Sequence, residues 1–193
     1  MALTKPAPGH WRYEDLLALP DDGRRYEIIE GELFEMPAPS WAHAIVIANL
    51  ILLIGPIVRA LGGQIATAPL DVFFPGADPV QPDILEVLPD GKARPSRRGL
   101  EGQPDLVIEV LSPSNREHDL LTKRALYARA GVREYWLIDP DARRIGVLAL
   151  DRDAFHLVQS ATGDDVAVSA LLAGAELPAA AIFAGIDADD ADA

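Results

Sequence analysis

The sequence contains no cysteine among its 193 residues. This absence excludes disulfide bonds, thiolate zinc sites, iron–sulfur clusters and cysteine nucleophiles. Any metal ion must therefore be held by oxygen or imidazole ligands. Hard divalent cations such as Mg²⁺ and Mn²⁺ are the metals that prefer all-oxygen ligation.

Basic residues are also scarce, with 17 Lys and Arg against 30 Asp and Glu, for a formal net charge of −13. Four of the negative charges lie at the end of the chain (Asp187, Asp189, Asp190 and Asp192), and removing these four leaves −9. This balance argues against tight binding to nucleic acid driven by charge alone.

Long unbroken hydrophobic runs are missing as well. Pro6 and Pro8 fall where a signal peptide would need an apolar stretch. The most apolar run, residues 44–58, is interrupted by Asn49 and falls short of the roughly 20 residues that cross a bilayer. We therefore expect a cytoplasmic protein with no membrane span.

What the sequence does contain is typical of one globular domain: 49% hydrophobic and 24% charged residues. We expect a single domain over residues 1–193, with a disordered acidic tail from about 186 to 193.

The periodicity of apolar residues predicts both helices and strands. The expected helices span residues 11–19, 41–61 and 115–130, and the expected strands span 26–29, 33–36, 64–74, 81–88, 105–111, 134–138, 144–150 and 155–159. Beyond residue 164 the pattern is weak. The helix over 41–61 is apolar nearly all round, so we expect it to be buried or covered by a second subunit, which predicts a homodimer.

One strand carries an acid among apolar residues. Alternation in the segment 106–111 places Glu109 on the same face as Val107 and Leu111. Burying an unpaired carboxylate costs several kcal/mol, so Glu109 should be protonated, paired or held against a cation. The alternative is a glutamate at a strand end that reaches solvent.

Two further residues are placed to join Glu109. Asp83 follows Pro82 at the start of the preceding strand, and a divalent cation between the two carboxylates would relieve their repulsion. Lys123 lies on the next helix, in a stripe with Asp119 and Tyr127. Alone, Pro-Asp is a common turn dipeptide and Lys123 an ordinary helical ion-pair partner.

The densest basic cluster of the chain lies in an expected loop over residues 89–104. It comprises Lys92, Arg94, Arg97 and Arg98. We expect these side chains to contact the phosphates of a weakly bound nucleic acid; the alternative is a solvated loop.

Taken together, these motifs resemble a known family. They are Pro82-Asp83, Glu109 in its apolar strand, Leu111-Ser112-Pro113-Ser114, Asp119, Lys123, Tyr127, and the run from Gly131 to Pro140. The chain resembles the putative restriction endonuclease family of bacterial proteins, abundant in cyanobacteria, which belongs to the PD-(D/E)XK phosphodiesterase superfamily. The resemblance extends from about Tyr26 to Phe155 and includes the segment 26–32 and His43.

The resemblance implies an α/β, restriction-endonuclease-like fold, with a mixed central sheet flanked by helices and a nuclease-like core over about residues 24–160. It also implies that Asp83 and Glu109 ligate Mg²⁺ or Mn²⁺ and that a lysine positions and activates the attacking water. The lysine usual in the superfamily lies two residues after the glutamate, where this chain has Leu111. The similar family places it on the following helix, at Lys123.

Glu32 and His43 are candidates for an auxiliary ligand or a water-orienting group, although a turn glutamate is usually solvated and a histidine at a helix start usually a capping or core residue. The function we expect is Mg²⁺-dependent endonucleolytic hydrolysis of phosphodiester bonds in nucleic acid, with DNA as the expected substrate. The high negative charge favours one alternative, a noncatalytic protein-binding or regulatory module that retains the fold. A metal hydrolase acting on a small phosphate ester is the third.

Overall fold

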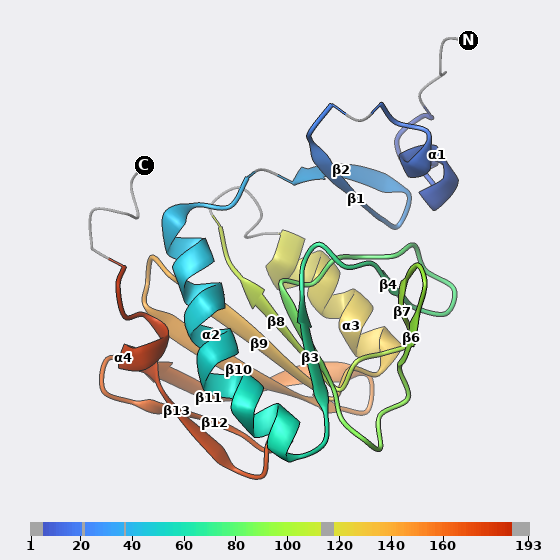
Figure 1. The fold of residues 1–193 in the computed structure, drawn as a ribbon. Coiled ribbons are helices and arrows are strands. Elements are labelled where there is room, and N and C mark those ends of the chain that lie inside the picture. The colour runs from blue at the N-terminus through green and yellow to red at the C-terminus, as the bar shows by residue number, and fades with distance from the viewer. Residues whose placement is uncertain (1–5, 21, 37, 113–117, 187–193) are drawn as a thin grey trace.

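A six-stranded mixed sheet forms the centre of the computed structural model, which describes residues 6–20, 22–36, 38–112 and 118–186. The strand order is β11-β10-β9-β8-β5-β3, and only β8 and β9 run parallel (Figure 1). The strands are β3 (Gln64–Thr67), β5 (Ile84–Val87), β8 (Leu106–Val110), β9 (Glu134–Asp139), β10 (Arg144–Asp151) and β11 (Ala154–Thr162). This arrangement confirms the predicted mixed sheet.

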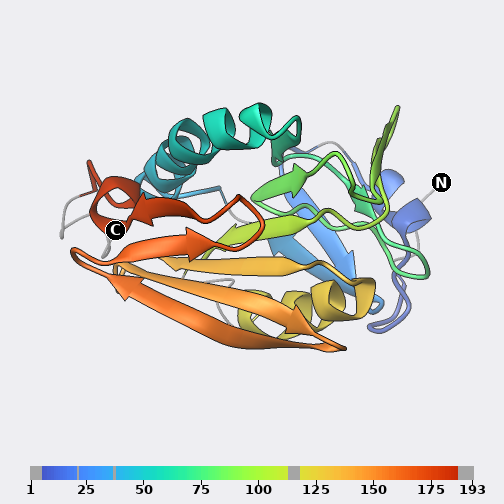
Figure 2. The same ribbon diagram turned by 90° about the horizontal axis from the view of Figure 1, so that it is seen from below.

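Helices cover the sheet on both faces. α2 (Trp41–Ala60) lies on one face, and α3 (Arg124–Ala130), preceded by the π-helix η1 (His118–Lys123), lies on the other (Figure 2). Gly131 ends α3 in the left-handed conformation, at φ 83°, as predicted. The first residues of the helix expected over 115–130 and the expected acidic tail lie outside the described residues, except for Ile186.

α2 begins where the sequence predicts, because Ser40 accepts a hydrogen bond from the backbone N–H of His43. With a mean hydropathy of 2.1 it has the length and composition of a membrane span. Val46, Leu50 and Ile54 are nevertheless fully buried in the core. Only one side of α2 is covered: Trp41 is 65% exposed and Leu52 73% exposed.

The N-terminal elements lie beside the sheet and follow the predicted pattern closely. They are α1 (Tyr13–Leu17) and the antiparallel hairpin of β1 (Arg25–Ile29) and β2 (Glu32–Met36). The hairpin turns at Glu30 and Gly31, both at positive φ. Ile29 packs into the core that α3 covers.

Two predictions about the middle of the chain are wrong. The strand expected over 64–74 is divided into β3 and β4 (Val72–Phe73), with Pro69 between them. The expected loop over 89–104 contains a hairpin of β6 (Arg94–Ser96) and β7 (Gly99–Glu101), which joins β4 in a three-stranded sheet. Prolines and charged residues are poor strand formers, so the pattern concealed the hairpin.

The segment after residue 164 also has more structure than its pattern indicates. It forms the hairpin of β12 (Val166–Ser169) and β13 (Ala175–Pro178), followed by α4 (Ala179–Ile182). Leu177 and Ile182 join the core under α2, and Asn49 of α2 donates hydrogen bonds to the carbonyls of Ile182 and Ala184. This segment therefore covers the part of the core beside α2.

Candidate functional site

Asp83 and Glu109 meet where β5 begins and β8 ends. The strands are antiparallel with Ile84 opposite Ile108, which brings the residue before β5 beside Glu109. The Asp83 N–H donates to Glu109 Oε2 at 3.4 Å, and the Val110 N–H donates to Asp83 Oδ2 at 2.8 Å. The structure thus brings together the two carboxylates that the sequence singles out.

Lys123 and Tyr127 contact the Glu109 carboxylate from the helix above it. The two residues are four apart, so both point from η1 and α3 toward the sheet. Lys123 Nζ lies 3.1 Å from Glu109 Oε1, and the Tyr127 hydroxyl donates to the same oxygen at 2.6 Å. Lys123 is only 1% exposed. A lysine on the helix therefore reaches the buried carboxylate of Glu109.

Glu27 is a member of the cluster that sequence reasoning missed. It lies on β1, is 2% exposed, and its Oε2 is 3.3 Å from Lys123 Nζ. Its Oε1 accepts a hydrogen bond of 2.6 Å from the Gln81 N–H. The sequence pattern that points to Glu109, an acid flanked by apolar residues in a strand, is also present at Glu27 and could have identified it. We call Glu27, Asp83, Glu109, Lys123 and Tyr127 the lysine cluster.

His43 lies at the outer side of the lysine cluster, in the first turn of α2. Its Nε2 is 3.2 Å from Asp83 Oδ2. The side chains of Asp83 and His43 are 20% and 15% exposed, whereas those of Lys123, Glu27 and Glu109 are exposed by 2% or less. Solvent therefore reaches the cluster at Asp83.

The surroundings fix the charge states of two members of the cluster. Burial acts to raise the pKa of Asp83, but His43, Lys123 and the Val110 N–H outweigh it, and the pKa is lowered below its usual value. Burial and the neighbouring carboxylates of Glu109 and Glu27 raise the pKa of Tyr127. Asp83 is thus ionised at neutral pH, and Tyr127 remains a hydrogen-bond donor.

The other predicted site residues lie elsewhere. Glu32 is exposed on β2, and no contact joins it to the lysine cluster within the described residues. The basic cluster lies on the β6–β7 hairpin and, at Lys92, just before it. This hairpin lies across the fold from the N-terminus of α2 (Figure 1).

Two members of the basic cluster have partners within the chain. The Arg94 guanidinium donates to the carbonyls of Gly91 and Ala93, while Arg98 pairs with Glu101 and lies 3.9 Å from the ring centroid of Phe73. Lys92 and Arg97 are exposed. The hairpin thus offers fewer available cations than its sequence suggests.

The lysine cluster fits a hard divalent cation by the chemistry of its donors. Asp83 and Glu109 supply carboxylate oxygens, and Asp83 Oδ1 has no hydrogen-bond partner among the described residues. Across those same residues, no three His, Asp or Glu side chains form a ready metal cage. Mg²⁺ commonly binds through one or two carboxylates and keeps several waters, so two carboxylates are a sufficient donor set.

A second group of buried acids lies near the other end of the same strands. We call Glu86, Asp105 and Glu134 the acid cluster. Glu86 is 0% exposed, and neither of its carboxylate oxygens has a hydrogen-bond partner within the described part of the chain. Burial, together with the charges of Glu134 and Asp105, raises the pKa of Glu86 to about 8. Sequence reasoning did not single out these residues.

Glu134 and Asp105 are satisfied by donors that Glu86 lacks. Glu134 accepts hydrogen bonds from the Trp136 indole N–H at 2.7 Å and from the Ala170 N–H at 3.2 Å. Asp105 accepts from the Leu88 N–H at 2.8 Å and pairs with Arg133 at 3.1 Å. Glu86 is therefore the acid of this cluster whose burial is not compensated by donors, and it is protonated at neutral pH.

Comparison with known proteins identifies the family of the chain and a solved structure of similar fold. The model of a family described as putative restriction endonuclease (Uma2) matches residues 13–180. The chain is similar to the crystal structure of a putative nuclease of Anabaena variabilis, from the family DUF820, with a TM-score of 0.70 and 22% sequence identity. That similarity covers 88% of this chain and 96% of the other, and it shows a shared fold. No curated protein matches the chain.

Proposed function

The chain belongs to the putative restriction endonuclease family, and from this premise we propose that it hydrolyses phosphodiester bonds of DNA with the help of Mg²⁺ or Mn²⁺. One observation carries the proposal: Asp83 and Glu109 adjoin each other where β5 begins and β8 ends, with Lys123 Nζ 3.1 Å from Glu109. Two carboxylates beside a lysine are suited to hydrolysis of a phosphodiester.

Asp83 and Glu109 would hold the cation in this proposal. A bound divalent cation would supply Lewis-acid stabilisation of the charge that develops on the phosphoryl oxygens and would lower the pKa of a bound water. The hydrogen bonds from Val110 to Asp83 and from Tyr127 to Glu109 orient the two carboxylates before substrate binds.

Lys123 would hold the attacking water and stabilise negative charge beside Glu109. Its ammonium group lies between Glu27 and Glu109 at 3.3 and 3.1 Å, which fixes its position without a bound ligand. His43 touches Asp83 at the exposed side of the cluster, where it would orient that carboxylate and contact the incoming strand.

Binding of DNA would be weak and strongly dependent on salt. The net charge of −13 opposes approach of a polyanion. Of the exposed cations of the basic cluster, Lys92 and Arg97 have no hydrogen bond or ion pair among the described residues. Phosphate contacts there would position the duplex but carry no sequence information.

A homodimer in the cytoplasm is the assembly we propose. The exposed side of α2 presents Trp41 and Leu52, and no residue from 41 to 58 is an acid, a lysine or an arginine. A twofold contact would bury this surface in both subunits.

The second candidate function is a noncatalytic module that retains the fold. The ion pair of Glu109 with Lys123 favours it, because this pair neutralises the buried carboxylate without a metal. Such a module would fold and bind its partner with the same residues but would not cut DNA.

The test is nicking of supercoiled plasmid in Mg²⁺ by the wild type, Asp83→Asn, and the control Asp90→Asn, whose side chain is 77% exposed. We expect Asp83→Asn to lose at least about 100-fold of the rate, since removing a charge-stabilising ligand costs several kcal/mol. Asp90→Asn should retain the wild-type rate. Equal rates in all three proteins would reject the proposed active site, and no cleavage by the wild type would favour the noncatalytic module.

A further inference from the structure

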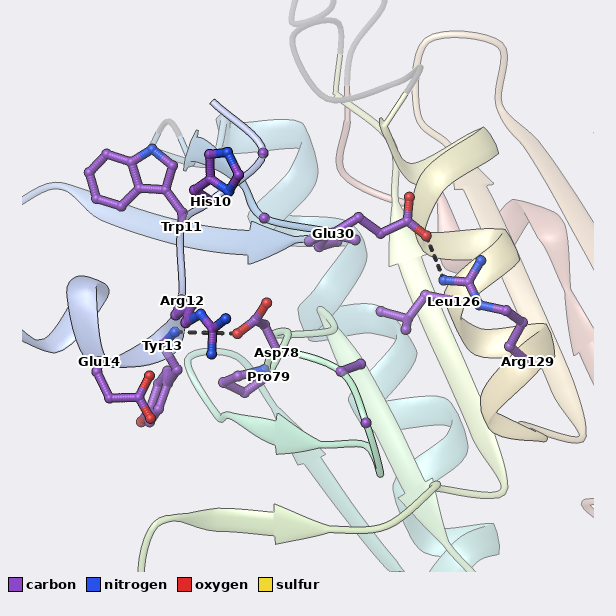
Figure 3. Close-up of a pocket in the computed structure, with 15 residues that line it drawn as sticks. His10, Trp11, Arg12, Tyr13, Glu14, Glu30, Asp78, Pro79, Leu126 and Arg129 are labelled. Carbon is purple, nitrogen blue, oxygen red and sulfur yellow. Dashed lines mark hydrogen bonds and ion pairs between the residues drawn. The ribbon is translucent and has the colours of Figure 1, made fainter. Parts of the chain in front are cut away.

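A cavity of about 700 Å³ lies between the segment 9–14, the β1–β2 turn, the loop 76–79 and α3 (Figure 3). We propose that this cavity binds a nucleobase of the DNA strand that the lysine cluster cleaves. The inference rests on the proposed function and names a substrate contact that the cluster itself does not provide.

The walls of the cavity combine apolar and polar surfaces in the way a nucleobase requires. Ile29, Pro79 and Leu126 contribute apolar side chains, while Arg12 and Asp78 project from facing segments (Figure 3). A base has apolar faces and a polar edge of donors and acceptors, so it needs both kinds of surface.

The charges on the cavity wall disfavour a phosphate group as the occupant. Arg129 is already paired with Glu30 at 2.7 Å, Arg12 faces the carboxylate of Asp78, and Glu14 also lines the cavity. These acids would repel a phosphate, whereas a neutral base can donate its amino group to a carboxylate and accept from an arginine. Asp78 is held in place by the Tyr13 N–H, which donates to its Oδ1 at 3.3 Å.

Three segments of the chain join the cavity to the lysine cluster. On β1, Ile29 of the cavity shares a strand face with Glu27 of the cluster. On α3, Leu126 of the cavity adjoins Tyr127. The third link is the loop that carries Pro79 and then Gln81, the donor to Glu27. A strand whose phosphate lies at Asp83 would therefore have the cavity within reach of a neighbouring base.

This contact would restrict the kind of DNA that is cleaved. A base inside the cavity cannot remain stacked in a duplex, and unpairing it costs a few kcal/mol unless it is already unpaired. The protein should therefore prefer single-stranded or locally unpaired DNA to a continuous duplex.

The test measures binding of short single-stranded DNA to the full chain in chelator, so that no cleavage is needed. The probes are a tetranucleotide and an abasic tetranucleotide with the same number of phosphates. The quantity measured is the affinity for the base-bearing probe divided by the affinity for the abasic probe. We expect the wild type to bind the base-bearing probe about tenfold more tightly, since stacking and edge contacts to one base are worth about that factor.

Two variants and a control test whether the ratio of the two affinities depends on the cavity. Arg12→Ala removes a wall contact and Ala77→Trp fills the space; in both, the ratio should fall toward one. Arg25→Ala removes an equal charge from the exposed start of β1, outside the cavity, and should weaken both probes alike.

The outcomes separate this inference from the proposed function. A wild-type ratio near one, or a tenfold ratio that survives in both cavity variants, overturns the nucleobase site even if plasmid nicking succeeds. A tenfold ratio lost in both variants supports the site even if the protein never cuts DNA.

Discussion

Glu109 and Glu86 are buried in the same sheet but have different partners. Glu109 and Glu86 are exposed by 1% and 0%, and both project from central strands. Lys123 and Tyr127 contact Glu109 and favour its charged form, whereas burial and nearby acids raise the pKa of Glu86 to about 8. Whether a buried carboxylate can serve as a ligand thus depends on its immediate donors, because depth alone favours the protonated form.

Removing the ammonium group of Lys123 should have the largest effect on the stability of the fold. Lys123→Met leaves Glu27 and Glu109 buried without the ammonium group that lies between them. We expect a loss of about 3 to 5 kcal/mol in the free energy of unfolding, measured by urea denaturation at pH 7. The exposed Lys92→Met is the matched control, and equal losses in the two variants would contradict the account of the lysine cluster.

Replacing Glu86 by a neutral residue should raise the free energy of unfolding, whereas Lys123→Met lowers it. Since its pKa is raised above the ordinary 4.5 to about 8, the folded state holds the proton more tightly than the unfolded state. The contribution of Glu86 to the free energy of unfolding is therefore fully present below pH 4.5. This contribution declines as the pH rises from 4.5 to about 8 and stays low above that. At pH 8 we expect Glu86→Gln to raise the free energy of unfolding by on the order of 2 to 3 kcal/mol.

The pH profile distinguishes this effect from a general surface change. In Glu86→Gln, the free energy of unfolding should fall less between pH 4.5 and 8 than in the wild type, because the carboxyl of Glu86 is gone. Glu35 is half exposed on β2, and Glu35→Gln should follow the wild type. A decline of the same size in Glu86→Gln would mean that Glu86 is not the protonated acid of the core.

A smaller effect is expected from the hydroxyl that completes the lysine cluster. Tyr127→Phe removes the 2.6 Å hydrogen bond to the charged Glu109 while keeping the ring in the core. A hydrogen bond to a charged group is worth about 1.5 to 3 kcal/mol, so we expect a loss near the lower value. Tyr26→Phe on β1, whose ring is half buried, is the control; a loss no greater than that of Tyr26→Phe would remove Tyr127 from the cluster.

The sequence predicts the elements whose pattern is local. The strand of Glu109, the helix from Trp41, the β1–β2 hairpin and the stop at Gly131 all depend on residues close in the chain. The β6–β7 hairpin and the segment after residue 164 owe their structure to tertiary packing, and propensity does not reveal that.

The same distinction applies to the site. The alternation around Glu109 and the helical spacing of Lys123 and Tyr127 indicate their shared location, which the structure shows. Glu27 and Glu86 are also acids among apolar residues in strands, but only the packing of distant segments decides which of them meets a lysine.

The most direct test of the central claim is the thermal stability of three proteins with and without Mg²⁺. If the lysine cluster binds the cation, saturating Mg²⁺ raises the Tm of the wild type and of Glu86→Gln by mass action and leaves Asp83→Asn unchanged. A shift that persists in Asp83→Asn but is lost in Glu86→Gln would place the cation in the acid cluster and contradict the account.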